Sequence, residues 1–247
     1  MSPTGGLAGT LDALREVPGW LSDDQAARLW ERARAVSGTG TIVEIGSYRG
    51  RSTIVLARAV KPEVRVLAID PHAGDDRGPR EIHGSPEAGE ADHRAFLANL
   101  AQAGVADRVR HVRLTSRDAL DAVAGSVDLL YVDGAHRYRP ARDDLARWGA
   151  RVAPGGTLLV HDAFSSVGVT LALLRLLLLG RDYRYLGRSR SLAEYRREPV
   201  AGRARAGNVL RQLAQLGWFA RNLAIKLALA ARLRPLARRL GSAEWPY

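Results

Sequence analysis

Apolar runs of strand length alternate with helical stretches through the middle of this chain. The strand-like runs are 41–45, 65–69, 109–114, 127–132 and 157–160, and the helical stretches are 52–60, 93–103, 119–123 and 139–151. Such alternation predicts right-handed crossovers and an α/β fold, a mainly parallel sheet with helices on both faces. Ligands of these sheets bind at the carboxyl ends of the strands, so the polar residues that follow each strand are the candidates for function.

Three segments around this pattern carry separate expectations. Residues 10–37 are predicted to form a helical cover with a break at Pro18-Gly19. The stretch from Pro71 to Asp92 is rich in Gly, Pro and charge, and a connection of that length predicts a lid over the ligand-binding edge. Residues 167–179 are almost wholly apolar but fall short of the roughly 20 residues that cross a bilayer, so we expect a buried helix there.

The charge of the chain is concentrated at its C-terminal end. The 247 residues carry a net charge of +11, yet residues 1–180 hold 22 basic and 22 acidic side chains, and residues 181–247 hold the remaining 15 and 4. We therefore divide the chain into a domain at 1–200, which includes the N-terminal cover helix and is neutral over 1–180, and a basic tail at 201–247. A neutral domain has no footprint for phosphates, which argues against a nucleic-acid substrate.

The basic tail is predicted to be an amphipathic helix over 204–233. At 100° per residue, one side is mainly apolar and the other mainly polar. The apolar side is Leu213, Leu216, Phe219, Ala220, Leu223 and Leu227, and the polar side is Arg211, Gln215, Arg221, Asn222, Lys226 and Arg232. A basic amphipathic helix fits peripheral contact with an anionic membrane, and it fits docking onto a second subunit in a homodimer equally well.

The composition also restricts the chemistry and the compartment. The chain has no cysteine, which excludes disulfides, thiolate zinc sites and cysteine nucleophiles, so any metal must use oxygen and nitrogen ligands. The first residues lack a basic start and a long apolar core. A secretory signal is therefore not expected, and we place the protein in the cytoplasm.

A glycine-containing turn follows the first predicted strand. Glu44 and Gly46 are separated by one residue, and Gly50 follows directly before a helix. Glycines let the backbone approach a ligand, and the helix N-terminus offers free N–H groups. Glu44 would repel a pyrophosphate but suits a ligand with an amino group and a sulfonium, which disfavours a nicotinamide-dependent oxidoreductase. Asp70 ends the second predicted strand, where carboxylates accept hydrogen bonds from ribose hydroxyls.

Four further polar residues follow the fourth and fifth predicted strands. Asp133 and His136 come after the run at 127–132, and His161 and Asp162 come after the run at 157–160. Neighbouring parallel strands bring these side chains to one edge of the sheet. Clustered carboxylates repel unless they are paired or bind a cation, and hard oxygen ligands suit Mg²⁺ or Mn²⁺. The histidines favour Mn²⁺ or another transition metal.

Several motifs occur in a fixed order between Val17 and Val169. They are VPGWL, IVEIGSYRGRSTIVLA, IDPH, FLANLAQAGVADRV, YVDGAHRY and APGGTLLVHD. In these motifs the chain resembles the class I S-adenosylmethionine-dependent methyltransferases, and specifically methyltransferase family 24, which is related to metal-dependent sugar and antibiotic O-methyltransferases. The resemblance implies a Rossmann-like sheet of seven strands. It implies that Glu44, Gly46, Ser47 and Gly50 hold the methionine part of the cofactor, that Asp70 binds the ribose, and that Ser116 and Asp118 lie near the adenine.

The resemblance also implies the metal ligands and the reaction. In the related enzymes a ligand follows the fourth strand and a pair follows the fifth, which corresponds here to Asp133 and to His161 with Asp162. Carboxylates or amides are usual for that pair, so His161 departs from the pattern. His136, beside Asp133, has a pKa range suited to a general base, and His161 is the alternative base. The expected reaction is methyl transfer to a hydroxyl of a sugar or other small polar metabolite, assisted by Mg²⁺ or Mn²⁺.

Two alternatives to this reaction stay open. One is a metal-independent methyltransferase for another small molecule, such as a phenolic natural product. The other is a membrane-associated accessory protein that keeps the fold without turnover, although such a protein has no need of an intact set of Asp133, His136, His161 and Asp162.

Overall fold

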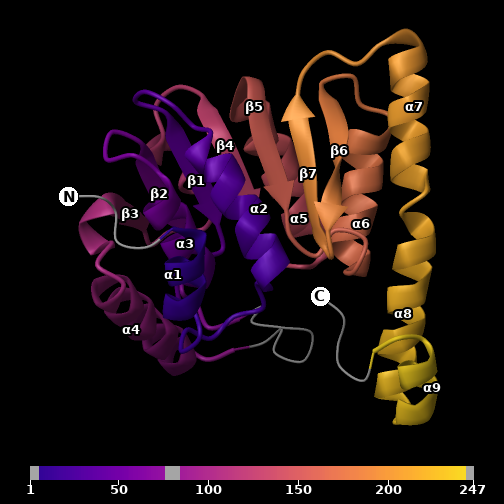
Figure 1. The fold of residues 1–247 in the computed structure, drawn as a ribbon, viewed down its shortest axis with the longest axis horizontal. Coiled ribbons are helices and arrows are strands. Elements are labelled where there is room, and N and C mark those ends of the chain that lie inside the picture. The colour runs from indigo at the N-terminus through magenta and orange to yellow at the C-terminus, as the bar shows by residue number, and fades with distance from the viewer. Residues whose placement is uncertain (1–5, 76–83, 243–247) are drawn as a thin grey trace.

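The computed structural model describes residues 6–75 and 84–242, and its centre is a seven-stranded sheet (Figure 1). The strands are β1 Thr41–Ile45, β2 Arg65–Ile69, β3 Val109–Val112, β4 Val127–Val132, β5 Val152–Val160, β6 Tyr183–Ser189 and β7 Leu192–Arg197. Their order is β3-β2-β1-β4-β5-β7-β6. Neighbours from β3 to β5 are parallel, and β7 runs antiparallel to β5 and to β6. The predicted Rossmann-like, mainly parallel sheet of seven strands is confirmed.

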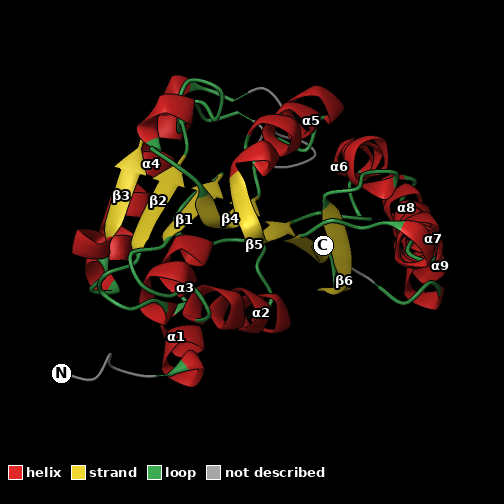
Figure 2. Cartoon of the chain, turned by 90° about the horizontal axis from the view of Figure 1, so that it is seen from above, coloured by secondary structure: helices red, strands yellow, loops and turns green. Residues whose placement is uncertain are grey.

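Helices cover both faces of this sheet (Figure 2). They are α1 Leu7–Ala13, α2 Asp23–Arg34, α3 Arg51–Ala59, α4 Pro86–Gln102, α5 Tyr138–Arg147, α6 Val167–Leu173, α7 Gly202–Leu213, α8 Leu216–Ala230 and α9 Arg234–Arg239. Side chains of α2, α3 and α4 pack on one face with Ile42, Val66 and Leu129. Side chains of α5 and α6 pack on the other with Val43, Leu67 and Leu130. These two hydrophobic cores, one on each face of the sheet, hold the strands in place and so position the residues that follow their carboxyl ends.

Several element boundaries differ from the predicted ones. β5 begins at Val152 rather than at 157, and residues 120–122 form a short 3₁₀ turn instead of a helix. The expected lid between Pro71 and Asp92 is partly helical, because α4 starts at Pro86, where the Ser85 hydroxyl accepts a hydrogen bond from Ala88 N at 3.2 Å. Residues 76–83 of that stretch lie outside the described residues.

The prediction of a buried helix at 167–179 is wrong for one face. Val169, Leu173 and Leu177 are buried, but Val167 and Leu171 are about half exposed. The cause is the helical period, since an α-helix that packs on one side alone leaves the opposite side in solvent even where its sequence is apolar. The helix ends in one π turn over Leu174–Leu178.

The tail forms α7 and α8 rather than one helix over 204–233, and its buried side is the unexpected one. Gln215 N donates to Gln212 O at 3.0 Å, a tighter turn that separates the two helices. Asn222, from the predicted polar side, is fully buried, whereas Leu227, from the predicted apolar side, is 63% exposed. The reason is that Asn222 Nδ2 donates to Phe164 O at 3.2 Å and Lys226 Nζ to Ser165 O at 3.0 Å, so polar groups meet the carbonyls of the loop after β5.

The predicted division at residue 200 falls between β7 and α7. α7 nevertheless contacts the sheet, because Asn208 Oδ1 accepts a hydrogen bond from Tyr185 N of β6 at 2.8 Å. The independence of the tail thus stays a prediction. Among the described helices, none has the length and apolar character needed to cross a membrane.

Candidate functional site

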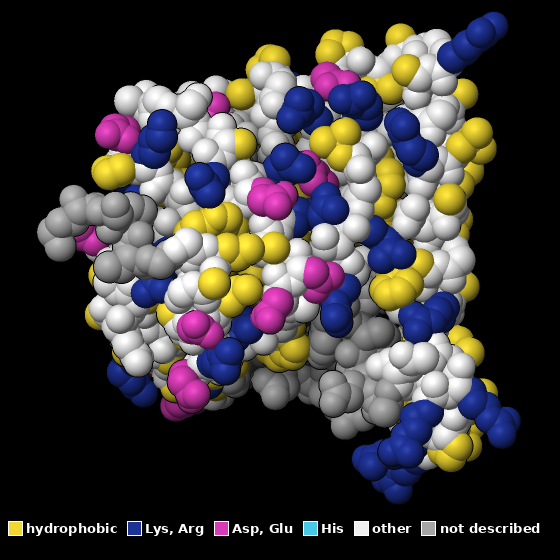
Figure 3. Space-filling model, viewed as in Figure 1, with side chains coloured by type: hydrophobic (Ala, Val, Ile, Leu, Met, Phe, Trp, Pro, Cys, Tyr) yellow, Lys and Arg dark blue, Asp and Glu magenta, His cyan; other side chains and the backbone are white. Residues whose placement is uncertain are grey.

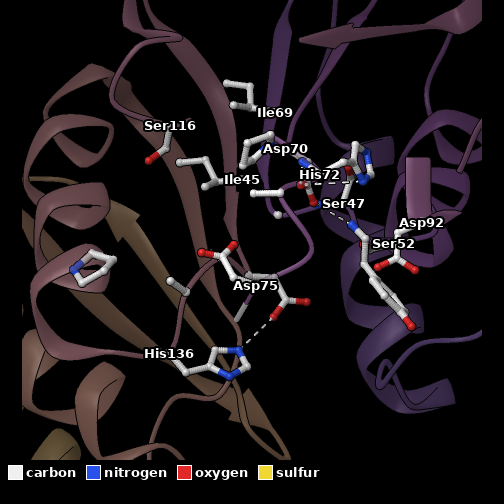
Figure 4. Close-up of a pocket in the computed structure, with 18 of the residues that line it drawn as sticks. Ile45, Ser47, Ser52, Ile69, Asp70, His72, Asp75, Asp92, Ser116 and His136 are labelled. Carbon is white, nitrogen blue, oxygen red and sulfur yellow. Dashed lines mark hydrogen bonds and ion pairs between the residues drawn. The ribbon is translucent and has the colours of Figure 1, made fainter. Parts of the chain in front are cut away.

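A cavity of about 290 Å³ lies at the carboxyl ends of β1, β2 and β4 (Figure 4). Gly46, Ser47, Asp70 and Ser116, four of the predicted cofactor residues, line it, and so do Asp133 and His136. Figure 4 shows Ser116 and His136 on one side of the cavity and Ser47, Asp70 and His72 on the other. The topology thus brings most of the predicted site residues to a single pocket.

The turn after β1 depends on glycine at Gly46. This residue has a φ of +83°, and a Cβ placed on it would lie 2.2 Å from Asp133 O. The turn therefore rests directly on the backbone at the end of β4, and a side chain at Gly46 would collide with protein before it reached a ligand. Gly50 has a φ of +88° and precedes α3, but it does not line the cavity; a Cβ there would meet the Phe96 ring at 3.2 Å.

Asp70 organises the same turn from the end of β2. Its Oδ2 accepts hydrogen bonds from the backbone N of Ser47 and of Tyr48, each at 2.9 Å, and its Oδ1 accepts one from His72 N at 2.7 Å. The carboxylate remains part of the cavity wall. Asp70 thus shapes the pocket, and its predicted contact with a ribose stays a prediction.

Glu44 lies beneath the turn and is not part of the cavity wall. It is fully buried, and its carboxyl group accepts hydrogen bonds from the hydroxyls of Ser52 and Thr53 at the start of α3. Burial raises its pKa to about 8, against the lowering effect of those two hydroxyls. Ser52 does line the cavity, so the geometry gives Glu44 an indirect route to a ligand through this hydroxyl.

The raised pKa of Glu44 predicts a pH-dependent stability. The folded state favours the neutral form, so the stability associated with Glu44 is present at low pH and is lost as the pH rises through about 8. Between about pH 5 and pH 8 the free energy of unfolding should fall by about 1.4 kcal/mol per pH unit from this group. In Glu44→Gln the fall of stability with pH should be shallower by that amount in urea unfolding without cofactor. Equal slopes in both proteins would refute the assignment.

The two residues expected near the adenine differ in position. The Ser116 hydroxyl lines the cavity and donates to Asp144 Oδ1 of α5. Asp118 is exposed outside the wall, where its carboxylate accepts a hydrogen bond from the Thr115 hydroxyl at 2.7 Å. Asp144 was not among the predicted residues, although it lines the cavity and burial raises its pKa to about 6. The sequence could have indicated Asp144, because this acidic residue lies on the same side of α5 as the buried Ala141 and Leu145.

Arg51 fastens the N-terminal cover over the pocket. Its guanidinium donates to the carbonyl oxygens of Leu14, Val17 and Leu21, the last at 3.1 Å. The residues between these anchors, Pro18 to Leu21, line the cavity, and the Trp20 ring packs on Tyr48 at 5.4 Å between centroids. The predicted cover segment is therefore part of the pocket, held by a residue that the sequence did not single out.

Replacing Arg51 with Met should loosen this cover. Loss of the charge-assisted hydrogen bonds is expected to lower the free energy of unfolding by about 3 kcal/mol. Affinity for S-adenosylhomocysteine should also fall about 10-fold, because Pro18 to Leu21 form one wall of the cavity. Arg15→Met is the matched control, since Arg15 is exposed on the same segment. Calorimetric titration of both variants tests this, and an unchanged affinity in Arg51→Met would remove the cover from the binding site.

The polar residues after β4 and β5 form one cluster. His136 Nε2 lies 2.9 Å from Asp162 Oδ2 and 3.9 Å from Asp133 Oδ1. His161 Nδ1 lies 3.1 Å from Asp133 Oδ1 and 3.6 Å from Asp162 Oδ2. Asp133 also accepts a hydrogen bond from the Tyr131 hydroxyl at 2.8 Å. The four predicted residues are thus in contact with one another, at the edge of the cavity where Asp133 and His136 form its wall.

The charges of this cluster compensate one another. Burial alone would lower the pKa of His136, but Asp162 and Asp133 outweigh it and raise this pKa to about 10. His161 shows the same balance, with burial opposed by Asp133, and its pKa is also about 10. Burial opposes ionisation of Asp162 too, yet the His136 charge holds its pKa well below the usual range. Each acid and each histidine of the cluster thus favours the charged form of its partner.

The donor set also fits a divalent cation. One ligand atom each from Asp133, His136 and Asp162 lies within 4.8 Å of the others. Asp162 Oδ1 is buried and accepts no hydrogen bond from a described residue. His161, which was predicted as a ligand in place of His136, lies behind this set and is only 3% exposed. Two carboxylates and an imidazole are suitable ligands for Mg²⁺ or Mn²⁺.

Comparison with known proteins agrees with this geometry. A family model described as a methyltransferase domain matches residues 43–163. The chain is 32% identical over 132 residues to a catechol O-methyltransferase of Mycobacterium tuberculosis, covering 53% of this chain and 51% of that protein. It is 31% identical over 125 residues to the uncharacterized protein y4gI of Sinorhizobium fredii, covering 49% of this chain and 13% of that one. The chain therefore spans about half or less of these curated relatives.

The fold has close counterparts among solved structures. The O-methyltransferase TomG of Streptomyces achromogenes, which is involved in tomaymycin synthesis and was solved with S-adenosylmethionine, superposes with a TM-score of 0.54 at 21% identity. That likeness covers 79% of this chain and 89% of TomG. With the match of residues 43–163 and the strand order β3-β2-β1-β4-β5-β7-β6, the chain is similar to the class I S-adenosylmethionine-dependent methyltransferases, as its motifs predicted.

Proposed function

We propose that this protein transfers a methyl group from S-adenosylmethionine to a hydroxyl oxygen of a small molecule, with a divalent cation held by Asp133 and Asp162 and with His136 as the residue that takes the hydroxyl proton. The observation that carries the proposal is that Asp133 and His136 line the same cavity as the glycine turn and Asp70. A cofactor held by the turn and an acceptor beside His136 would then share one pocket, which is what displacement at a methyl group requires.

The geometry supports His136 over His161 as the residue that handles the acceptor proton. His136 is 32% exposed and lines the cavity, whereas His161 is buried and does not. Asp162 holds a proton on His136 Nε2 at 2.9 Å, so this ring donates in the paired state and accepts only when that proton has left. His161 positions Asp133 from behind at 3.1 Å. A divalent cation held by Asp133 and Asp162 would supply a Lewis acid that lowers the pKa of the acceptor hydroxyl.

The residues that line the cavity indicate which class of acceptor it would bind. A sugar-like or other small polar hydroxyl compound is the acceptor we favour, since Asp92, Asp75 and Arg137 add polar groups to the wall. A phenolic acceptor is the second candidate, because the neighbouring Trp20 and Tyr48 rings offer an aromatic surface there. A matched acceptor screen with sugars, catechols and simple phenols separates the two.

Calorimetry tests the proposal in two steps. S-adenosylhomocysteine should bind at micromolar concentration, and Mn²⁺ should bind separately, with an affinity that falls in Asp133→Asn. The acceptor screen then follows in the presence and absence of Mn²⁺. Tight binding of a nicotinamide dinucleotide in place of S-adenosylhomocysteine would overturn the methyltransferase assignment, and retention of cofactor without turnover on any hydroxyl compound would favour the accessory alternative.

A further inference from the structure

The outer side of the C-terminal helices carries leucines that no core packing explains. Five of them are between 39% and 66% exposed: Leu210, Leu213, Leu227, Leu233 and Leu236. The inner side of α8 is already occupied, because Asn222, Ile225 and Ala228 are buried. Single exposed leucines are ordinary on a protein surface, but a row of them along consecutive helices marks an interaction surface.

The same helices carry only positive charge. Residues 201–242 contain eight arginines and Lys226 and no aspartate or glutamate. Six of these arginines are exposed: Arg203, Arg211, Arg232, Arg234, Arg238 and Arg239. None of the arginines from Arg203 to Arg239 forms an ion pair with another described residue. Figure 3 shows dark blue side chains gathered around α9 and yellow ones along the outer edge of α7 and α8.

Exposed leucines together with positive charge favour one kind of partner over the others that could bind an apolar surface. A second copy docked on the same helices would bring another set of cations against the first, with no acid in residues 201–242 to compensate them. A nucleic acid would match the charge and leave the leucines in water. Anionic lipid matches both, because phosphate head groups pair with the arginines while the leucines enter the head-group boundary.

We propose that the α7–α9 surface, formed by Leu210, Leu213, Leu227, Leu233, Leu236 and the neighbouring arginines, binds the anionic surface of a membrane peripherally. α8 is tied to the loop after β5 by Asn222 and Lys226, so it cannot swing free of the domain. That loop contains Asp162, which lies 2.9 Å from His136 in the cavity wall. A membrane held by α8 and α9 would therefore lie at the same end of the molecule as the proposed active site.

Vesicle flotation of the full chain tests the charge component. Vesicles of phosphatidylcholine mixed with phosphatidylglycerol should bind the protein at low salt, vesicles of phosphatidylcholine alone should not, and high salt should release it. The triple change Arg234→Gln, Arg238→Gln and Arg239→Gln should weaken partitioning about 100-fold. The control triple Arg15→Gln, Arg34→Gln and Arg147→Gln removes the same charge from the domain and should keep binding.

The apolar component is tested on the leucines. Leu210→Ser with Leu227→Ser should weaken partitioning by about 10-fold or more, whereas Leu97→Ser, at a leucine of α4 that is 47% exposed, should leave it unchanged. Unchanged affinity for S-adenosylhomocysteine shows that each variant is folded. Failure of the full chain to float with the mixed vesicles overturns the proposal, and so does equal loss in the control variants. Self-association without lipid that Leu227→Ser abolishes would overturn it in favour of a second copy.

Discussion

Replacing Asp162 with Asn is expected to lower methyl transfer about 1000-fold while the affinity for S-adenosylhomocysteine stays within about threefold. Asp162 is 3% exposed and pairs with His136 at 2.9 Å, but it does not line the cavity, so its loss acts on the acceptor side and not on cofactor binding. Its φ of +54° lies in the left-handed region, which asparagine tolerates almost as well as aspartate does. The substitution therefore removes the charge and keeps the backbone.

Asp133→Asn should have the same effect on turnover, since Asp133 contacts His161 and lies in the cavity wall. Asp121→Asn is the control, an exposed acid in the 3₁₀ turn after β3. Single-turnover assays with a hydroxyl acceptor and calorimetry with S-adenosylhomocysteine measure the two effects separately. Treatment with a chelator should reproduce the loss, and added Mn²⁺ should reverse it. Full activity in the presence of chelator would show that the reaction needs no cation. Normal turnover of Asp162→Asn would show that the cluster of Asp133, His136, His161 and Asp162 has no part in the reaction.

The central strands were readable from the sequence because burial on both faces leaves a continuous apolar run. β1, β2 and β4 begin and end at the predicted residues, and every residue of β1 is buried. β5 was predicted too short because Pro154, Gly155 and Gly156 interrupt its apolar pattern. β6 and β7 each contain two arginines and have no such pattern, so the expected strand count rested on the family resemblance.

The site was predictable only where function follows strand order. Asp70, Asp133 and His136 come directly after strands, and parallel topology brings them together. Arg51 and Asp144 act through partners about 30 residues away, such as Leu21 and Ser116, and no local pattern records such pairs. The buried side of α8 was misread for a related reason, since Asn222 is buried by a carbonyl of a distant loop and not by its own hydropathy.

Gly46→Ala should damage both the stability of the fold and the binding of the cofactor. Two costs are added there: a φ of +83°, which alanine adopts poorly, and a Cβ that would lie 2.2 Å from Asp133 O and 2.7 Å from Asp133 C. Gly125→Ala distinguishes the cost of the backbone conformation from the cost of the collision, because Gly125 has a φ of +84° and a Cβ added there would have nothing within 4 Å. The strain of the left-handed backbone is therefore common to both variants, and the collision with β4 belongs to Gly46 alone.

We expect Gly125→Ala to lose about 1–2 kcal/mol of unfolding free energy and to bind S-adenosylhomocysteine normally. Gly46→Ala should lose about 3 kcal/mol more, because the neighbour is backbone at the end of a buried strand and cannot rotate away. It should also show no measurable cofactor binding, since relief of the clash moves the turn that Asp70 holds through Ser47 and Tyr48. Urea unfolding and calorimetry give both quantities. Equal losses of stability in the two variants would mean that the contact between the turn and β4 is not as close as 2.2 Å implies.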